Sequence, residues 1–460
     1  MAGLPDAKID IVRTLVREAP DKVVDGLRSA LAMAAGDTAL AGVRRLVDAE
    51  VADRNLRNKV LEPIAPLFVG DGSAPAALTF PSRALALLWR GLKVEAPAVI
   101  AKAALLATEH QPDEGATDPF DLPVELLADG VELGQQPDYE AAVALIEQAR
   151  PGGREVLLSC LAISPVVRRA TLRLPEWISR TTPERAAAAR LAYRDACRFG
   201  ADAGPRFFEM LGAQLAEPWT ILRVVSAVMD RPVEDYLAGS ELSVFAIRVM
   251  DLVDLNLAKV AGFDLDGGPA AGTAAAAVVE TLIHQITELE NAIDLDRDGR
   301  WGRRIHKQKQ SLAGVVEMRL RELAKLQDAA LPTQAVRVAR TTVSDPLLTA
   351  EPDPKHVDRC RSLLAFAEGV RASADYGGFS STRAKVMERA GEALDRYVDN
   401  VLSLVRDREV ADRGIAARYL QIAAEFAGPI HEPRAGEIVR RRAAAAFNLT
   451  KAEPPVAGDL

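Results

Sequence analysis

The residues best suited to chemistry stand together between two long helical stretches, at residues 294–309. Asp294, Asp296 and Asp298 alternate with other residues and are followed by Gly299. Carboxylate oxygens at this spacing are ligands for a hard cation such as calcium. Directly after them come cations that suit an acidic partner, namely Arg300, Arg303, Arg304, His306, Lys307 and Lys309. One short segment therefore offers two kinds of binding site.

The acidic part of this segment resembles the first half of an EF-hand loop. In such a loop, oxygens at positions one, three and five surround calcium, and a glycine makes the bend. The second half departs from the pattern, because Gly302 stands at the ninth position and Ile305 stands where a bidentate glutamate is required. The resemblance covers six residues. It implies calcium, bound by Asp294, Asp296 and Asp298, and we expect no other cofactor.

The charges of this segment oppose the dipoles of the helices around it. Acids crowd the carboxyl end of the first helix and bases the amino end of the second, at a cost of about 0.3–1 kcal/mol per charge. The sequence favours compensation by mutual pairing across the turn, which at an exposed site stabilises by ~0–1 kcal/mol per pair. A bound ion and an acidic partner are the alternatives.

A tryptophan lies within this charged segment, between Gly299 and Gly302. An exposed tryptophan beside arginines is typical of a binding hot spot. The predicted contact surface therefore consists of Arg300, Trp301, Arg303, Arg304 and Lys307. The alternative, favoured because large aromatic side chains are usually buried, is that Trp301 closes the core of the hairpin.

Other patterns that could support chemistry are weak. The motifs GxSxG, GxxxxGK[ST], GxGxxG, HExxH and ExxH are absent from the sequence. Glu280, His284 and Glu288 have metal-like spacing, but they fall opposite an apolar stripe and are predicted to be solvated. The three cysteines are widely separated, which indicates apolar residues in a reducing compartment. We predict no catalytic residue.

Two amphipathic helices must position the charged segment. The first has apolar residues at steps of three and four, and so does the second; they are Val279, Leu282, Ile283, Ile286, Leu289 and Ile293, then Leu312, Val316, Leu320 and Leu323. Helices joined by a short polar loop are expected to pack antiparallel through such stripes.

The chain as a whole is predicted to be all-α. It has 460 residues, of which 49% are hydrophobic and only 5% aromatic, a composition that favours close-packed helices. We expect irregular stacked helical hairpins, either a degenerate α-solenoid or a multi-helix bundle, with a C-terminal helical bundle. A net charge of -8 argues against nucleic-acid binding. Without a signal-like start or a long apolar run, we expect a cytoplasmic protein that does not insert into membranes.

Turn residues and prolines divide the chain. The predicted regions are an N-terminal helical region (1–110), central stacked short helices (124–263), the long hairpin (264–330), a linker (331–354), a C-terminal helical bundle (355–449) and a mobile tail (450–460). One short helix is expected from Arg154 to Ile163, and another is expected to begin with Thr182 as its cap and Pro183 at its first position.

A near-heptad seam marks one helix of the predicted C-terminal bundle. Its members are Val386, Ala390, Leu394, Tyr397, Val401 and Leu404. Such a seam requires a partner along its length, either a neighbouring helix of the same domain or the same helix in a coiled-coil dimer.

The sequence therefore favours a non-enzymatic helical scaffold or adaptor that mediates protein–protein interaction in the cytoplasm. Its expected partner is another protein with an acidic surface. One alternative is an enzyme or small-molecule binder with an inter-helical cavity. The other is an ion-dependent regulatory adaptor that uses the turn from Asp294 to Gly299.

Overall fold

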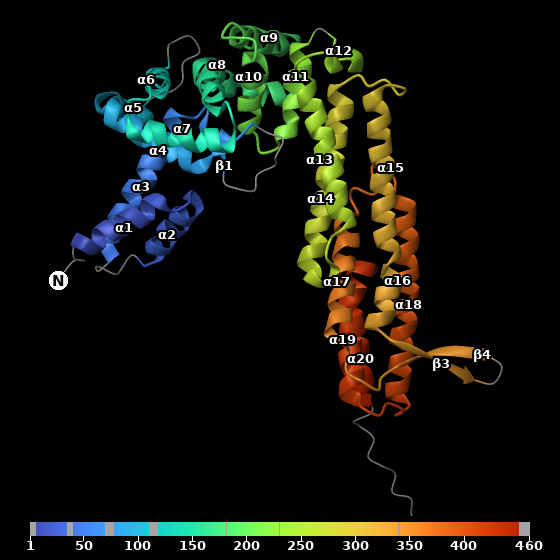
Figure 1. Cartoon of the computed structure of the whole chain (residues 1–460). Helices are drawn as coiled ribbons and strands as arrows, with labels where there is room; N and C mark the ends of the chain where they lie inside the picture. Colours follow the sequence, from blue (N-terminus) through green and yellow to red (C-terminus); the bar gives the residue numbers. More distant parts are fainter. Residues whose placement is uncertain are drawn as a thin grey trace, which may run out of the picture. The chain divides into compact units, whose positions relative to one another are not determined.

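The computed structural model describes residues 6–34, 40–69, 78–109, 118–180, 182–229, 231–338 and 341–449. Helices dominate these residues, and the strands form two small two-stranded sheets (Figure 1). The all-α class is therefore confirmed. The chain divides into two compact units, Met1–Pro232 (unit 1) and Val233–Leu460 (unit 2). The predicted tail, residues 450–460, lies outside the described residues.

Unit 1 is built around its longest helix, α8. This helix contacts α6, α7, α9, α10 and α11. The elements are α1 (Asp6–Glu18), α2 (Asp21–Met33), α3 (Ala41–Val60), η2 (Ala65–Leu67), β1 (Phe68–Val69), β2 (Phe80–Pro81), α4 (Ser82–Glu95), α5 (Pro97–Glu109), α6 (Asp121–Leu133), α7 (Pro137–Ala149), α8 (Gly153–Ser179), α9 (Pro183–Cys197), α10 (Ala203–Ala213), η3 (Pro218–Ile221) and α11 (Leu222–Val228). β1 and β2 pair in parallel, with Phe68 opposite Phe80.

Helix α8 differs from its predicted extent. The sequence predicts an end at Ile163 because Pro165 follows, but the helix continues through Pro165 and Pro175 to Ser179. Proline removes one backbone donor and usually ends a helix. Here one face of the helix beyond Pro165 is buried and includes Val167, which is fully buried, and Leu174. Packing of that second half outweighs the local preference, as is common for helices with a buried face.

Unit 2 consists of long helices with one β-hairpin. Its elements are α12 (Glu234–Ala238), α13 (Ser243–Ala261), η4 (Leu265–Gly267), α14 (Gly268–Ala292), α15 (Arg300–Arg321), α16 (Leu323–Ala330), β3 (Thr333–Val338), β4 (Thr341–Pro346), α17 (Pro354–Gly369), α18 (Ser380–Arg406), α19 (Arg413–Ile430) and α20 (Ala435–Leu449). No described helix of either unit combines the length and the apolar character that a bilayer span requires.

The two helices of the predicted hairpin are α14 and α15, but their packing differs from the expectation. α14 approaches α17 and α13 more closely than it approaches α15. A Cβ atom on Gly272 would lie 1.9 Å from the carbonyl oxygen of Ser362, so glycine lets the backbones of α14 and α17 meet. The apolar stripe of α14 therefore packs against several helices, whereas the sequence predicted packing against α15 alone.

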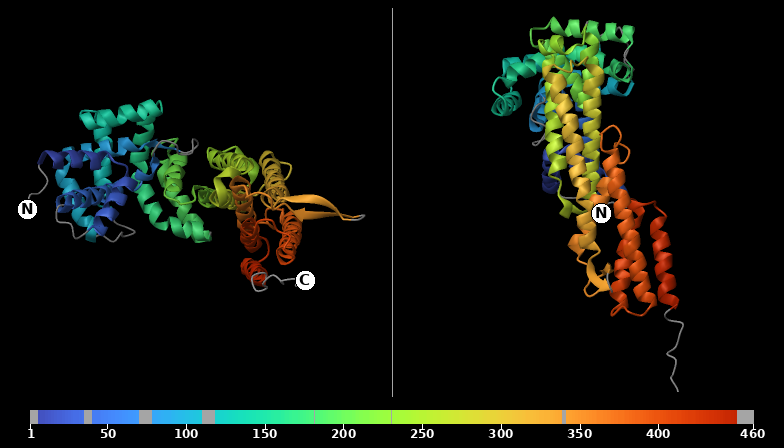
Figure 2. Two further views of the ribbon diagram at one scale, coloured as in Figure 1. Left: turned by 90° about the horizontal axis from the view of Figure 1, so that it is seen from below. Right: turned by 90° about the vertical axis from the view of Figure 1, so that its right-hand side faces the viewer.

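The predicted linker, residues 331–354, contains a β-hairpin inside unit 2. β3 and β4 pair antiparallel, with Thr333 opposite Pro346. The hairpin projects from the helices of its own unit (Figure 2) and touches α18, where Asn400 Nδ2 donates to the carbonyl oxygen of Ser344 at 3.1 Å. The division between compact units falls instead at Pro232, within the range predicted as central stacked helices.

The heptad seam of α18 has partners inside unit 2. Leu394 and Val401 are fully buried, and α18 contacts α15, α16, α19 and α20. Gln327 Nε2 of α16 also donates to the carbonyl oxygen of Ala390 at 3.0 Å. Neighbouring helices therefore cover the seam, as the simpler interpretation proposed, so a dimer would use another surface.

Candidate functional site

The turn between α14 and α15 is organised by Asp296. Its side-chain Oδ1 accepts from the backbone N–H of Asp298 at 3.0 Å, and its carbonyl oxygen accepts from the N–H of Gly299 at 2.9 Å. A Cβ atom on Gly302 would lie 1.9 Å from the same carbonyl oxygen. Glycine is therefore required at residue 302, because the turn folds back onto the first turn of α15.

A carboxylate from α12 caps α15. Glu234 accepts from the backbone N–H of Trp301 at 2.6 Å and from that of Gly302 at 3.1 Å. The side chain is buried, and a Cβ atom on Gly299 would lie 2.5 Å from its oxygens. The N–H of Glu234 in turn donates to the carbonyl oxygen of Asp294 at 3.0 Å. A negative charge at a helix amino end satisfies orphan donors and the macrodipole together.

The bases near this end of α15 pair with helices outside the turn. Arg304 Nη2 lies 2.5 Å from Asp251 and 2.6 Å from Asp254, both on α13. Partial burial alone would lower the pKa of Arg304, but these two carboxylates outweigh it and raise that pKa. Lys309 Nζ lies 2.8 Å from Glu290 of α14, and this hydrogen bond raises the pKa of Lys309.

The expected mutual pairing across the turn is therefore wrong. Within the described part of the chain, no ion pair joins Asp294, Asp296 or Asp298 to the bases of residues 300–309. The turn folds back so that Asp296 serves its own backbone. The compensation comes from the acids of α12, α13 and α14, which the tertiary fold brings to the start of α15.

The acids predicted to bind calcium are exposed side chains of the turn, at residues 294, 296 and 298. Among the residues that the structure describes, no group of three or more histidines, cysteines or carboxylates is arranged to hold a metal ion. In the other candidate set, Glu280 and His284 are exposed as predicted, whereas Glu288 is buried. Calcium binding at the turn stays a prediction.

The predicted contact surface separates into buried and exposed members. Trp301 is only 4% exposed, so its side chain belongs to the core, as the alternative interpretation proposed. Arg304 is engaged by α13. Arg300, Arg303 and Lys307 are exposed and make no ion pair or side-chain hydrogen bond with any described residue. We call these three residues the basic stripe, because steps of three and four place them on one side of α15.

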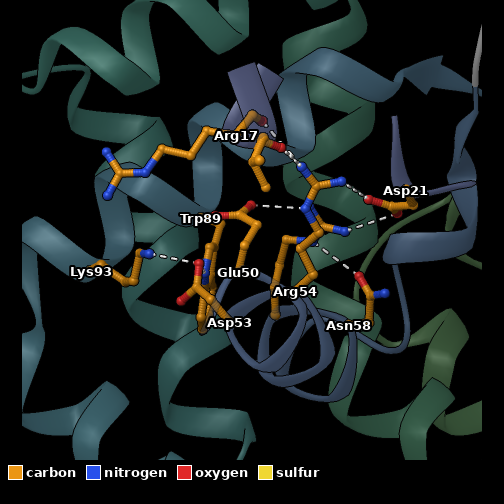
Figure 3. Close-up of polar contacts among 10 residues, drawn as sticks. Arg17, Asp21, Glu50, Asp53, Arg54, Asn58, Trp89 and Lys93 are labelled. Atoms are coloured by element: carbon orange, nitrogen blue, oxygen red, sulfur yellow. Dashed lines mark hydrogen bonds and ion pairs between the residues drawn. The ribbon is translucent and has the colours of Figure 1, made fainter. Parts of the chain in front are cut away.

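A polar cluster of unit 1 was not predicted. Arg54 of α3 is buried, and its guanidinium donates to the carbonyl oxygens of Val16 and Arg17 at 2.9 and 3.2 Å (Figure 3). The same group pairs with Asp21 at 2.5 Å and with Glu50 at 2.8 Å. Arg54 therefore fixes the end of α1 and the start of α2 against α3.

Asp53, the residue before Arg54, joins α3 to α4. Asp53 Oδ2 accepts from the indole Nε1 of Trp89 at 3.1 Å and pairs with Lys93 Nζ at 2.8 Å (Figure 3). Trp89 is buried, and both donors belong to α4. The contacts around residues 53 and 54 thus connect four helices, α1 to α4.

A second unpredicted cluster surrounds Arg168 of α8, which is 3% exposed. Its guanidinium donates to the carbonyl oxygens of Lys59 and Val60 at 3.1 and 2.6 Å. Asp121 and Glu62 lie 3.5 Å from it. Burial lowers the pKa of Arg168 and raises the pKa values of both acids. Its carbonyl partners are the last residues of α3.

Both clusters belong to a device that recurs along the chain. An arginine of one helix donates to the last carbonyl oxygens of another, where helix ends lack internal partners and carry negative dipole charge. Further pairs of this kind are Arg44 with Ala34, Arg154 with Glu132, Arg190 with Ala227, Arg223 with Ile178, Arg319 with Ala261, Arg383 with Ala367 and Arg413 with Phe447. Structural capping of helix ends therefore accounts for the carbonyl contacts of Arg54 and Arg168.

A weak sequence signal accompanies the buried arginines. Arg54 follows Val47 and Val51 at steps of four and three, so it occupies an apolar position of α3. An arginine in an apolar stripe must find partners, since a buried unpaired charge is costly. Glu234 has no such signal, because it precedes the turn that it caps by some sixty residues.

An open groove of about 500 Å³ lies between α17 and α19. Its lining is largely apolar and includes Pro352, Val357 and Ile422. The two arginines at the groove already have acidic partners, Arg361 with Glu425 and Arg418 with Glu351.

Comparison of the chain with protein-family models, with curated proteins and with solved structures gave no match. Functional inference therefore depends on the chain's own contacts.

Proposed function

We propose that this protein is a non-enzymatic helical scaffold or adaptor that binds another protein in the cytoplasm. The basic stripe, Arg300, Arg303 and Lys307, is the contact, and an acidic surface is its partner. One observation carries the proposal: Arg304 and Lys309 of α15 have acidic partners within unit 2, whereas these three cations are exposed and have no acidic partner among the described residues. Free guanidinium groups recognise carboxylates through paired hydrogen bonds.

The support beneath the stripe favours a recognition role. Glu234 fixes the start of α15, Arg304 ties α15 to α13, and Lys309 ties it to α14. A surface held in one conformation loses little entropy on binding, which favours affinity. The described cysteines form no disulfide with one another, which is consistent with the cytoplasm, since thiols persist in a reducing compartment.

The proposal is tested by reversing charges on the full chain. The variant Arg300→Glu with Lys307→Glu is compared with Lys385→Glu with Arg389→Glu, a matched pair of exposed cations on α18. Both chains and the unmodified chain are immobilised, and proteins are captured from lysate at about 50 mM salt, where screening is weak. We expect the first variant alone to lose acidic partners.

Two results would count against the stripe. Capture of the same proteins by all three chains would show that the stripe is not the contact. Capture that requires added calcium, with a calcium-dependent rise in melting temperature, would favour the ion-dependent adaptor.

A further inference from the structure

A partly exposed apolar stripe runs along α13. Val244, Ile247 and Leu255 are 40%, 38% and 46% exposed, although the opposite side of the helix is packed against its unit. Asp251 lies between them, and the four residues follow one another at steps of three, four and four. This is the spacing with which one helix packs against another. We call these four residues the α13 stripe.

The α13 stripe and the basic stripe form one surface of unit 2. Arg304 pairs with Asp251 and Asp254, and Gln308 Nε2 donates to the carbonyl oxygen of Met250 at 2.8 Å. Further along α15, Arg319 donates to the carbonyl oxygen of Ala261, so α13 and α15 run in the same direction. Arg304 therefore stands at the boundary between the two stripes.

The cations border the apolar residues along this boundary. Arg300 lies one helical turn before Arg304, and Ile247 lies one turn before Asp251, so these two residues are at the same level. Lys307 lies almost one turn after Arg304, towards the level of Leu255. The carboxylates of Asp251 and Asp254 are satisfied by Arg304, which leaves Arg300 and Lys307 to attract acidic groups.

We propose that the partner's binding segment is an amphipathic helix that lies along α13 and α15. This inference rests on the proposed function and specifies the partner of the same site. Apolar residues of the partner helix pack on Val244, Ile247 and Leu255, and glutamates or aspartates on its flank pair with Arg300 and Lys307. Helix-in-groove recognition uses anchors at steps of three and four, which the α13 stripe matches over three turns.

The test uses the full chain and a synthetic helical peptide of about 18 residues, ~27 Å long. The peptide carries leucines at steps of three and four and glutamates along one flank. One control peptide has the same composition scrambled around the helix, and another has lysines in place of the glutamates. Binding is followed by fluorescence anisotropy. We expect the first peptide to bind at least about tenfold more tightly than either control, a free-energy difference of about 1.4 kcal/mol.

Variants of the chain separate the two stripes. Ile247→Asp should weaken the leucine–glutamate peptide at least about tenfold, whereas Leu172→Asp, at a similarly exposed leucine of α8, should not. Arg300→Glu with Lys307→Glu should abolish the preference for the glutamate peptide over the lysine peptide. Lys385→Glu with Arg389→Glu should leave that preference intact.

The possible failures are distinguishable. Equal binding of the scrambled acidic peptide, lost in the Arg300/Lys307 variant, would overturn the helical partner and leave the acidic contact standing. Binding by none of the peptides, together with unchanged capture by the charge-reversed chain, would overturn both proposals. Concentration-dependent self-association abolished by Ile247→Asp would identify a second copy of the chain as the occupant and would also overturn the partner helix.

Discussion

The side chain of Glu234 determines the conformation of the turn before α15. The sequence suggested that a bound ion or the neighbouring acids would compensate the charges at the amino end of α15. Glu234, from a distant segment, accepts hydrogen bonds from the backbone N–H groups at this helix end. Gly299 and Gly302 make this possible, since a side chain at either residue would meet the Glu234 carboxylate or the Asp296 carbonyl oxygen. The two glycines therefore have a packing role besides making a bend.

Replacing Glu234 tests this role. Glu234→Ala should destabilise the start of α15 by about 2–3 kcal/mol, because two buried N–H donors lose a charged acceptor. Glu234→Gln keeps the shape and one acceptor oxygen, so about half of that loss is expected. Hydrogen exchange of a peptide spanning residues 297–305, followed by mass spectrometry, measures both effects. Equal protection in the alanine variant and the unmodified chain would show that the cap does not stabilise the turn.

The cysteines should differ in reactivity. Burial raises the pKa of Cys160 and of Cys360 to about 12, whereas Cys197 is only partly buried. The reactive thiolate of a thiol with so high a pKa is scarce at about pH 8. We expect Ellman's reagent to modify Cys197 first, and the other two only after unfolding. Rapid modification of Cys160 or Cys360 in the folded chain would contradict their burial.

Residue-scale prediction from sequence succeeded where the signal is local. Thr182 caps α9, accepting from the N–H of Arg185 at 3.3 Å, and Pro183 is the first helical residue, as predicted. It failed for Glu234, Arg54 and Arg168, whose partners come from other helices. No pattern within one window of sequence can specify such a partner.

At the scale of elements, arginines connect helices within each unit. Each of these arginines lies on one helix and caps the carboxyl end of another. Helix carboxyl ends commonly use glycine or lysine of their own last turn. In this chain the cap often comes from a neighbouring helix, as with Arg54 on α1 and Arg168 on α3. Each such contact fixes the position of one helix end against another helix, which apolar packing alone does less specifically.

Arg54 offers the clearest test of these caps. Arg54→Met keeps the apolar stem but removes the guanidinium that donates to the Val16 and Arg17 carbonyl oxygens and pairs with Asp21 (Figure 3). Asp21 keeps its contact with Arg57 at 3.3 Å. Because Asp21 is largely exposed, most of the loss comes from the charged hydrogen bonds to the two carbonyl oxygens, at a cost of about 1.5–3 kcal/mol. We expect faster hydrogen exchange across α1 and α2. Arg28→Met, at a surface arginine paired with Asp48, is the control and should change stability by at most ~0.5 kcal/mol. Similar effects of both substitutions would show that capping by Arg54 does not stabilise the end of α1.

The crossing of α14 and α17 depends on Gly272. Gly272→Ala places a Cβ atom 1.9 Å from the Ser362 carbonyl oxygen, so the helices must separate, at an expected cost of about 1–3 kcal/mol. Gly314 of α15 has no neighbour within 4 Å of the same atom. Gly314→Ala should therefore stabilise by about 0.5–1 kcal/mol through helix propensity. Thermal unfolding followed by circular dichroism should show opposite shifts; shifts of one sign would refute the close approach.

Periodicity predicted which stretches are helical but not which neighbour each helix meets. The stripes of α14 and α15 are buried as expected, yet α14 packs most closely on α17 because Gly272 admits it. The sequence predicts a linker at residues 331–354, because its four prolines and polar run lack a helical period, whereas the structure has a β-hairpin within that range. The hairpin also contacts α18 through Asn400, and the local sequence does not reveal this neighbour.

At the scale of the whole molecule, the chain separates at Pro232 into two units with their own buried cores. The sequence does not predict this boundary well, because the stretch without secondary structure directly before Val233, Arg231–Pro232, is short. The first residues of unit 2 contact the rest of that unit. Val233 forms a β-bridge with Asp294, and Glu234 caps α15. A cut beyond this stretch should therefore damage unit 2, whereas a cut before it should not.

Two fragments test whether the units are independent domains. Residues 231–460 retain Val233 and Glu234, and this fragment should unfold in one cooperative thermal transition, since its size and core are those of an ordinary domain. Residues 241–460 lack both, so the peptide spanning residues 297–305 should lose hydrogen-exchange protection by the same mechanism as in Glu234→Ala. The circular-dichroism spectra of fragments 1–232 and 231–460 should add up to that of the whole chain. A gradual, non-cooperative transition in fragment 231–460 would mean that unit 2 needs unit 1 in order to fold, and the basic stripe would then have to be studied only in the intact chain.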